Sequence, residues 1–290
     1  MRIANVGGRA TLVVPGGDDR GVDIANASGG KFGPDPQGLY DEWDAFTDFV
    51  ADLDLSTATI AMFDRTDLRS PVPSPRQVFA IGVNYRAHAA ETGADLPEVP
   101  ATFTKFPASI TGPFADVELP NGTVDWEVEL VAVIGRRADR VGVADAWSHI
   151  AGLTVGQDLS DRHLQLAAGG QFSLGKSHRG FAPIGPWVVT PDEFDDPDDL
   201  ELGCSIDGEA MQDARTSDLV FGVSQLVAEL SAVVPLLPGD IIFTGTPGGV
   251  GVSRKPPRFL QPGETLESWI EGIGTIRTRF VSPAGGRNVG

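Results

Sequence analysis

The chain has 290 residues, which is enough for one large domain or two smaller ones. Asp and Glu number 40 against 22 Lys and Arg, so the net charge is -18, and no run of basic residues occurs. Nucleic acids and anionic membranes are bound through clustered Lys and Arg, so the sequence predicts neither as a partner.

No segment of the sequence predicts export or membrane insertion. Residues 1–8 lack the apolar core of a signal peptide. No apolar run approaches the roughly 18 residues that a membrane span requires. Cys204 is the only cysteine, so no internal disulfide can form. We therefore expect a cytoplasmic protein. The 36 glycines and 22 prolines indicate many turns and a β-rich fold.

The first seventy residues predict a small α+β unit, with short strands at residues 9–14 and 21–25. The prolines of Ser-Pro-Val-Pro-Ser-Pro, residues 70–75, disfavour helix and predict an extended linker. We expect a domain over residues 1–70 and a second over residues 76–290. Apolar residues at spacings of four, three and four predict one face of a helix in the first unit: Leu39, Trp43, Phe46 and Val50.

A short buried strand at residues 78–82 leads into a predicted helix that begins near Asn84. His88 and Glu91 lie three apart on this helix and share a face. A carboxylate beside an imidazole can orient the ring and raise its basicity, which makes a general base. A surface pair without a role is the alternative, and for an isolated pair it is the commoner case.

The alternation of apolar and acidic residues at 124–130 is the most informative pattern in the chain. Asp125, Glu127 and Glu129 fall on one face of a predicted strand, roughly 6.5 Å apart, with apolar residues on the other face. Like charges in one row destabilise a sheet. A divalent cation such as Mg²⁺, Mn²⁺ or Ca²⁺ would explain them, because hard cations prefer carboxylate oxygens. A solvated acidic face is the other reading.

Asp158 follows an apolar stretch and lies at a predicted strand-to-helix junction, before a candidate cap at Ser160. Such an Asp is usually a turn or capping residue, yet it could supply a third carboxylate beside Glu127 and Glu129. On the helix that follows, Arg162 and Gln165 lie three apart and face the same way.

Residues 170–177 formally fit the P-loop pattern, but the context contradicts that reading. A P-loop follows a strand and opens a helix whose N-terminus meets phosphate. Here a predicted helix precedes the segment, and glycines and prolines follow it. Lys176 remains of interest because a lysine in an apolar segment can bind a carboxylate or an enolate, although it could equally be a plain surface lysine.

A second long helix is predicted after a cap at Thr216 or Ser217. A strand at residues 241–243 then ends in a glycine-rich loop, residues 244–251, that could let backbone approach a ligand or simply form tight turns. The apolar face of the helix comprises Leu219, Val223, Leu226, Val227 and Leu230.

Taken together and in order, these segments resemble the fumarylacetoacetate hydrolase family from about Val78 to Phe280. Five segments carry the resemblance: Gly82–Glu91 with Asn-Tyr-x-x-His-x-x-Glu, Asp125–Leu130, Gln157–Gln165 with Asp-x-Ser-x-Arg-x-x-Gln, Gly175–Ser177 and Thr244–Gly251.

The resemblance implies an α+β, mostly β fold of rolled mixed sheets, a small N-terminal domain typical of a bacterial-type branch, and a homodimer. It implies a metal site for Mg²⁺, or Mn²⁺ or Ca²⁺, and a catalytic group in which a His–Glu dyad activates water. The implied ligands are Glu127, Glu129 and Asp158; the catalytic residues are His88, Glu91 and Lys176; the substrate-binding residues are Arg162, Gln165 and Thr246. Asp125 is left as a supporting acid.

The chain departs from the family pattern beside Lys176. His178 and Arg179 stand where the family often has an aromatic residue and an acid, and Gln157 replaces a frequent asparagine. These changes leave the implied metal ligands intact, but they bear on the choice of substrate.

The predicted function is a metal-dependent hydrolase that cleaves a carbon–carbon bond in a small 2-oxo acid or 1,3-diketo acid of the acylpyruvate or fumarylacetoacetate type. The same groups could serve a decarboxylase, isomerase, hydratase or oxaloacetate tautomerase of aromatic-compound breakdown. A non-catalytic metal-binding protein is a third reading.

Overall fold

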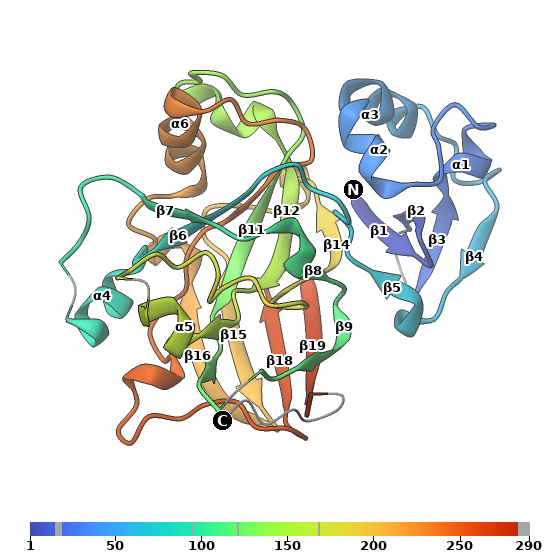
Figure 1. The fold of residues 1–290 in the computed structure, drawn as a ribbon. Coiled ribbons are helices and arrows are strands. Elements are labelled where there is room, and N and C mark those ends of the chain that lie inside the picture. Colours follow the sequence, from blue (N-terminus) through green and yellow to red (C-terminus); the bar gives the residue numbers. More distant parts are fainter. Residues whose placement is uncertain (15–18, 94, 121, 168, 284–290) are drawn as a thin grey trace.

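The computed structural model describes residues 1–14, 19–93, 95–120, 122–167 and 169–283, and β-strands dominate it (Figure 1). The predicted mixed, mostly β fold is confirmed. The largest sheet has the order β4-β3-β2-β1-β14-β12-β11-β17-β6-β7, with β5 beside β1 and β8 beside β14. Its strands are β1 (Arg2–Val6), β2 (Arg9–Val13), β3 (Arg20–Asp23), β4 (Ile60–Met62), β5 (Leu68–Arg69), β6 (Val78–Gly82), β7 (Ala101–Thr104), β8 (Ile110–Thr111), β11 (Val128–Ile134), β12 (Ile150–Gln157), β14 (Ala182–Val189) and β17 (Ile241–Phe243).

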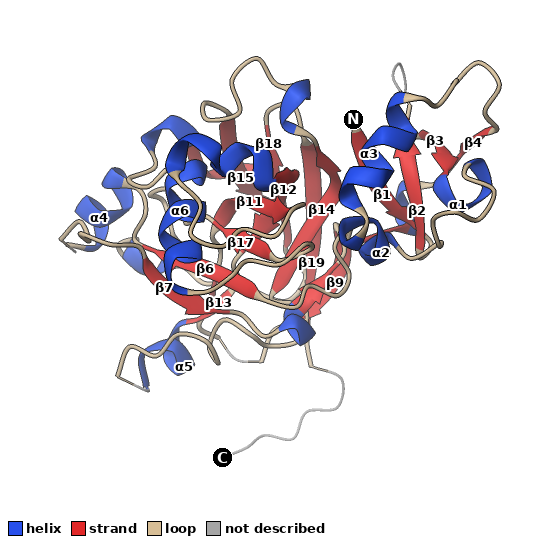
Figure 2. Ribbon diagram, turned by 90° about the horizontal axis from the view of Figure 1, so that it is seen from above, coloured by secondary structure: helices blue, strands red, loops and turns tan. Residues whose placement is uncertain are grey.

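A second sheet has the order β16-β15-β18-β19-β9 and packs against β11 and β12 of the first. Most neighbours are antiparallel, but β17–β6, β14–β8 and β19–β9 are parallel. Seen from above, the N-terminal unit lies to one side of these sheets (Figure 2). The strands are β9 (Phe114–Glu118), β15 (Glu201–Ile206), β16 (Glu209–Arg215), β18 (Thr265–Ile270) and β19 (Gly274–Val281), and a separate two-stranded ladder joins β10 (Val124–Asp125) to β13 (Ser160–Asp161).

The N-terminal unit is joined to the rest through the sheet, because β1 pairs with β14 as well as with β2. The division into domains at residues 1–70 and 76–290 stays a prediction, and residues 284–290 lie outside the described part. The single helix expected here is two helices. Glu42 has φ -119° and ψ 32°, which ends one helix and begins the next, yet Leu39, Trp43 and Phe46 are buried as expected. The helices of this unit are α1 (Ile24–Ala27), α2 (Pro36–Asp41) and α3 (Trp43–Ala51).

The acidic strand is interrupted at Trp126 and Glu127, between β10 and β11. Two glutamine side chains accept the backbone hydrogen bonds that a neighbouring strand would otherwise accept there. The Glu127 amide donates to Gln157 Oε1 at 2.9 Å, and the Val128 amide donates to Gln212 Oε1 at 2.9 Å. Both faces of this segment are buried, so the reading as a solvated acidic face is wrong.

Helices of the larger part begin later than the sequence indicates. The expected Ser160 cap is absent, since that hydroxyl donates to the Asp158 carbonyl, and the Asp161 carboxylate accepts from the Leu164 amide instead. Thr216 and Ser217 do not cap the long helix, because it begins only after Gly222; their hydroxyls donate to Asp198 and Asp199 instead. Leu219 therefore precedes that helix. The helices are α4 (Arg86–Thr92), α5 (Arg162–Ala167) and α6 (Val223–Val233).

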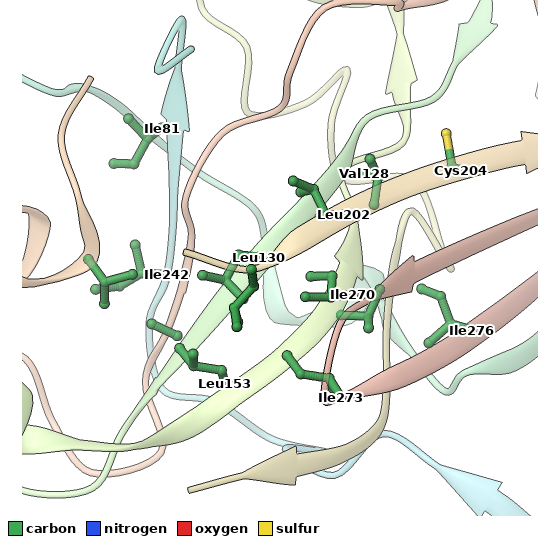
Figure 3. Packing of buried hydrophobic residues seen from close by; sticks show 14 of the residues in the cluster. Ile81, Val128, Leu130, Leu153, Leu202, Cys204, Ile242, Ile270, Ile273 and Ile276 are labelled. Carbon is green, nitrogen blue, oxygen red and sulfur yellow. The ribbon is translucent and has the colours of Figure 1, made fainter. Parts of the chain in front are cut away.

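The main core lies between the two sheets (Figure 3). Leu130 and Leu153 from one sheet meet Leu202 and Ile270 from the other, and all four are buried. Burial of each such side chain is worth about 1.5–3 kcal/mol. This packing fixes the position of β11, the strand that carries Glu129.

No helix in the described part of the chain is long and apolar enough to cross a membrane.

Candidate metal and catalytic site

The ends of four neighbouring strands, β12, β11, β17 and β6, lie on the same side of the large sheet. This arrangement brings segments that are distant in sequence close together. Val128, at the start of β11, lies opposite Gln157 at the end of β12. Phe243, at the end of β17, lies beside Val131 and Ala80. The segments before β11 and after β6, β12 and β17 therefore share one side of the molecule.

Glu127, Glu129 and Asp158 come together at this edge. One carboxylate oxygen from each lies within 4.8 Å of the other two, and all three residues are buried. Three convergent carboxylates form a donor set that fits a hard divalent cation, with room left in its coordination for small oxygen ligands. The structure thus brings together the three residues that the sequence singled out.

The pKa values of Glu127 and Glu129 are shifted in opposite directions, because different charges surround the two carboxylates. Burial raises the pKa of Glu129 well above its usual value, and the nearby charges of Asp158 and Glu127 add to the effect. Burial alone would also raise the pKa of Glu127, but Lys176, Arg162 and His88 outweigh it and lower that pKa to about 2. A divalent cation among the three would favour the ionised form of each.

Two buried lysines contact the acids. Lys176 Nζ lies 2.6 Å from Glu127 Oε2 and 2.7 Å from Asp158 Oδ2. Lys105 Nζ lies 2.5 Å from Asp158 Oδ1 and also donates to the Lys176 carbonyl. Burial lowers the pKa of Lys105 although Asp158 opposes this. Sequence reasoning missed Lys105; its one signal is the rarity of lysine, of which the chain has four.

Arg162 and Gln165 lie on one face of α5, as expected, and bond to each other at 2.9 Å through Arg162 Nη1 and Gln165 Oε1. Arg162 Nη2 also lies 2.8 Å from Glu127 Oε1 and 2.7 Å from Asp125 Oδ2. The guanidinium is therefore bound into the carboxylate group and is not free on the helix surface.

His88 and Glu91 face each other on α4, with 3.5 Å between His88 Nδ1 and Glu91 Oε2. The imidazole is buried. The Gly249 amide donates to both oxygens of Glu91 at 3.1 Å. The glycine-rich loop thus approaches the acid of the pair through its backbone.

Thr246 lies in the same loop, but its hydroxyl is engaged within the protein. It donates to the Val128 carbonyl at 2.9 Å and accepts from Gln212 Nε2 at 2.8 Å. This ties the loop to the interruption before β11. Contact between Thr246 and a substrate stays a prediction.

His178, which departs from the family pattern, contacts an acid and an aromatic ring. His178 Nε2 lies 3.1 Å from Asp161 Oδ2, and the ring packs on Phe181. Arg179 is exposed. The imidazole therefore pairs with an acid on the segment between Asp158 and α5.

A family model described as the C-terminal domain of fumarylacetoacetate (FAA) hydrolase matches residues 77–281. The chain belongs to the fumarylacetoacetate hydrolase family. Oxaloacetate tautomerase FAHD2A, mitochondrial, of Bos taurus is 43% identical over 215 residues, which are 73% of this chain and 68% of the relative. Relatives in this family are named as hydrolases, isomerases and tautomerases, so this protein is an enzyme.

Solved structures of family members share the whole fold. An HpcE-named protein of Mycobacterium smegmatis is 53% identical, with a TM-score of 0.90, 98% of this chain covered and 100% of that one. Maleylpyruvate hydrolase of Sphingobium sp. SYK-6, solved with manganese(II) and pyruvate, is 28% identical, with a TM-score of 0.80 and coverages of 98% and 100%. The family chain thus carries a candidate acidic site of the kind suited to a divalent metal.

The predicted location and assembly receive no such support. The mammalian relatives are named as mitochondrial proteins, so the cytoplasmic location stays a prediction. The homodimer likewise stays a prediction.

Proposed function

We propose that this family member is a divalent-metal-dependent hydrolase that cleaves a carbon–carbon bond in an acylpyruvate-like 2-oxo acid. The observation that carries the proposal is the buried group of Glu127, Glu129 and Asp158 beside the His88–Glu91 pair. Relatives named for hydrolysis, isomerisation and tautomerisation of small oxo acids support the substrate class.

Glu127, Glu129 and Asp158 would hold Mg²⁺ or Mn²⁺. A bound divalent ion supplies Lewis acidity that favours an enolate over the keto acid. Lys176, which contacts two of these acids, would add positive charge that stabilises an enolate oxygen. Arg162 and Gln165 would orient the substrate from α5, with Thr246 on the facing loop.

His88 would take the proton from a water that attacks the distal carbonyl, while Glu91 keeps the ring oriented. The new carbon–oxygen bond forms as the carbon–carbon bond breaks, and the bonding electrons pass to the pyruvate-side carbon. Protonation of that carbon gives pyruvate, and the acyl part leaves as a carboxylic acid. The Gly249 amide holds Glu91 in place for this step.

The test is steady-state turnover of acylpyruvates by the chelated protein, alone and with added Mg²⁺ or Mn²⁺. We expect hydrolysis that depends on the metal and that falls by about 10²-fold or more in His88→Ala, the usual contribution of general base catalysis. Rapid decarboxylation of oxaloacetate without any metal-dependent hydrolysis would contradict the proposal.

Keto–enol tautomerisation is the second candidate, because the bovine relative at 43% identity is named for that reaction with oxaloacetate. It requires a proton shuttle but no attack by water. A His88→Ala variant that retains full tautomerase activity while hydrolysis is lost would assign the His88–Glu91 pair to hydrolysis alone. Full tautomerase activity in that variant, with no metal-dependent hydrolysis by the wild type, would favour tautomerisation as the main reaction.

A further inference from the structure

Asp125 is a fully buried acid that the reaction described above does not use. It is 0% exposed, and four residues donate to its carboxylate or contact it with a cationic group. Its Oδ1 accepts from the amides of Trp126 at 2.8 Å and Gly251 at 2.7 Å, and its Oδ2 accepts from the Val252 amide at 3.0 Å. Arg162 completes the set through Nε at 2.8 Å and Nη2 at 2.7 Å. Three backbone amides and one guanidinium therefore fix the position of this carboxylate.

Arg162 is shared between two carboxylates of different kinds. Its Nη2 lies 2.7 Å from Asp125 Oδ2 and 2.8 Å from Oε1 of Glu127, a proposed metal ligand. A cation that faces one carboxylate alone competes with a metal for it, whereas a cation divided between two competes less. Asp125 contacts both Nε and Nη2 of the guanidinium, whereas Glu127 contacts Nη2 alone.

Asp125 also links this pair to the loop that holds the dyad. Gly251 and Val252, which donate to Asp125, lie two and three residues after Gly249, which donates to Glu91. One short stretch of backbone thus contacts both the acid of the His–Glu pair and the acid that binds Arg162. A shift of either acid would displace this stretch of backbone and, with it, the other acid.

We propose that Asp125 is a positioning residue that holds Arg162 so that Glu127 remains available to the divalent metal. The inference rests on the proposed function only in taking Glu127 as a ligand. Partners that orient a ligand from behind typically change metal affinity by about 10–100-fold when removed. The effect should reach the metal through Arg162 and not through the field of Asp125 alone.

The experiment measures Mn²⁺ affinity of the chelated full chain by the loss of the free-ion electron paramagnetic resonance signal, without any substrate. Asp125→Asn keeps the shape and removes the charge, and we expect about tenfold weaker Mn²⁺ binding. Asp240→Asn is the matched control. Asp240 is also 0% exposed and accepts from the Gln77 and Leu237 amides, but it precedes β17 at the end away from the site. It should lower the melting temperature and leave Mn²⁺ affinity unchanged.

An Arg162→Gln background separates the two routes by which Asp125 could act. If the acid works through the guanidinium, Asp125→Asn should have at most a small effect on Mn²⁺ affinity in that background. An equal loss in both backgrounds, or wild-type affinity in Asp125→Asn, would overturn the inference. If Asp125→Asn does not fold, Arg162→Gln alone decides, because it should tighten Mn²⁺ binding, and unchanged or weaker binding would contradict us. Absence of Mn²⁺ binding by the wild type would instead overturn the proposed function and this inference with it.

Discussion

At the scale of single residues, Lys105 shows what a buried charge does at the site. Its ammonium is 0% exposed and holds both Asp158 and the Lys176 carbonyl. Lys105→Met would leave these acceptors without that donor. Breaking a buried pair costs about 3–5 kcal/mol, so we expect the free energy of unfolding to fall by that amount in a denaturant titration. Lys31→Met, at an exposed lysine, should leave the midpoint unchanged; an equal loss in both variants would contradict this account.

Substitution of Glu91 tests whether its carboxylate contributes to catalysis. Glu91→Gln retains an oxygen that can accept from the Gly249 amide but removes the charge that faces His88. We expect kcat for acylpyruvate hydrolysis to fall by about 10²-fold, within the usual range for general base catalysis. Mn²⁺ affinity should be unchanged, because Glu91 lies outside the acidic group. A variant with full kcat would show that the imidazole needs no carboxylate.

Most of the candidate site could be predicted at this scale. Glu127, Glu129 and Asp158 were singled out by strand periodicity, a strand-to-helix junction and a family resemblance, and the structure brings them together. Lys105 could not be found, because its role depends on a fold that carries its side chain to Asp158, 53 positions along the chain. Periodicity describes which face a residue shares with its neighbours, and it says nothing about such remote pairs.

At the scale of elements, the glycine-rich loop contacts the site through its backbone, and its conformation depends on glycine. Gly249 has a φ of +103°, and a Cβ there would collide with the Met211 carbonyl. Gly249→Ala should displace the amide that holds Glu91 and lower kcat/KM by about tenfold or more, since small misplacements in a site are costly. The chain offers a matched control, Gly263, with a φ of +97° and no atom within 4 Å of a Cβ.

Gly263→Ala should cost only the backbone strain, about 1–3 kcal/mol, with kcat/KM intact in the same assay. Equal losses of activity in the two variants would mean that strain alone, and not the approach to Glu91, matters. The sequence indicated that this loop is glycine-rich but left open whether it bound a ligand or formed tight turns. Only the fold shows which carbonyl lies against which glycine.

Element boundaries were predicted less well than element types. The acidic strand was expected to be continuous, but Gln157 and Gln212 accept from the amides of Glu127 and Val128 in place of a neighbouring strand. Both glutamines are distant in sequence, so no local pattern could reveal them. The strand from residue 78 and the strand at 241–243 were correct, since short buried runs between turn signals are a strong local indication.

At the scale of the whole molecule, one sheet runs through both predicted domains. Ala4 in β1 lies between Thr11 of β2 and Trp187 of β14. A second buried cluster also crosses the predicted boundary, with Ile3 and Phe46 packed in one group with buried residues of β11, β14 and β17. The sequence could predict an N-terminal unit but not this pairing, which joins residues more than 180 positions apart.

We therefore expect calorimetry of the full chain to show one cooperative unfolding transition. Ala4→Pro should lower the temperature of that single transition, because proline removes a ladder donor in a strand paired on both sides. Separate transitions in the wild type, with only the first shifted by Ala4→Pro, would show instead that residues 1–70 unfold independently. In that case the β1–β14 ladder would be a contact between two stable domains, and the site built on β11 and β12 would keep its metal affinity after the first transition.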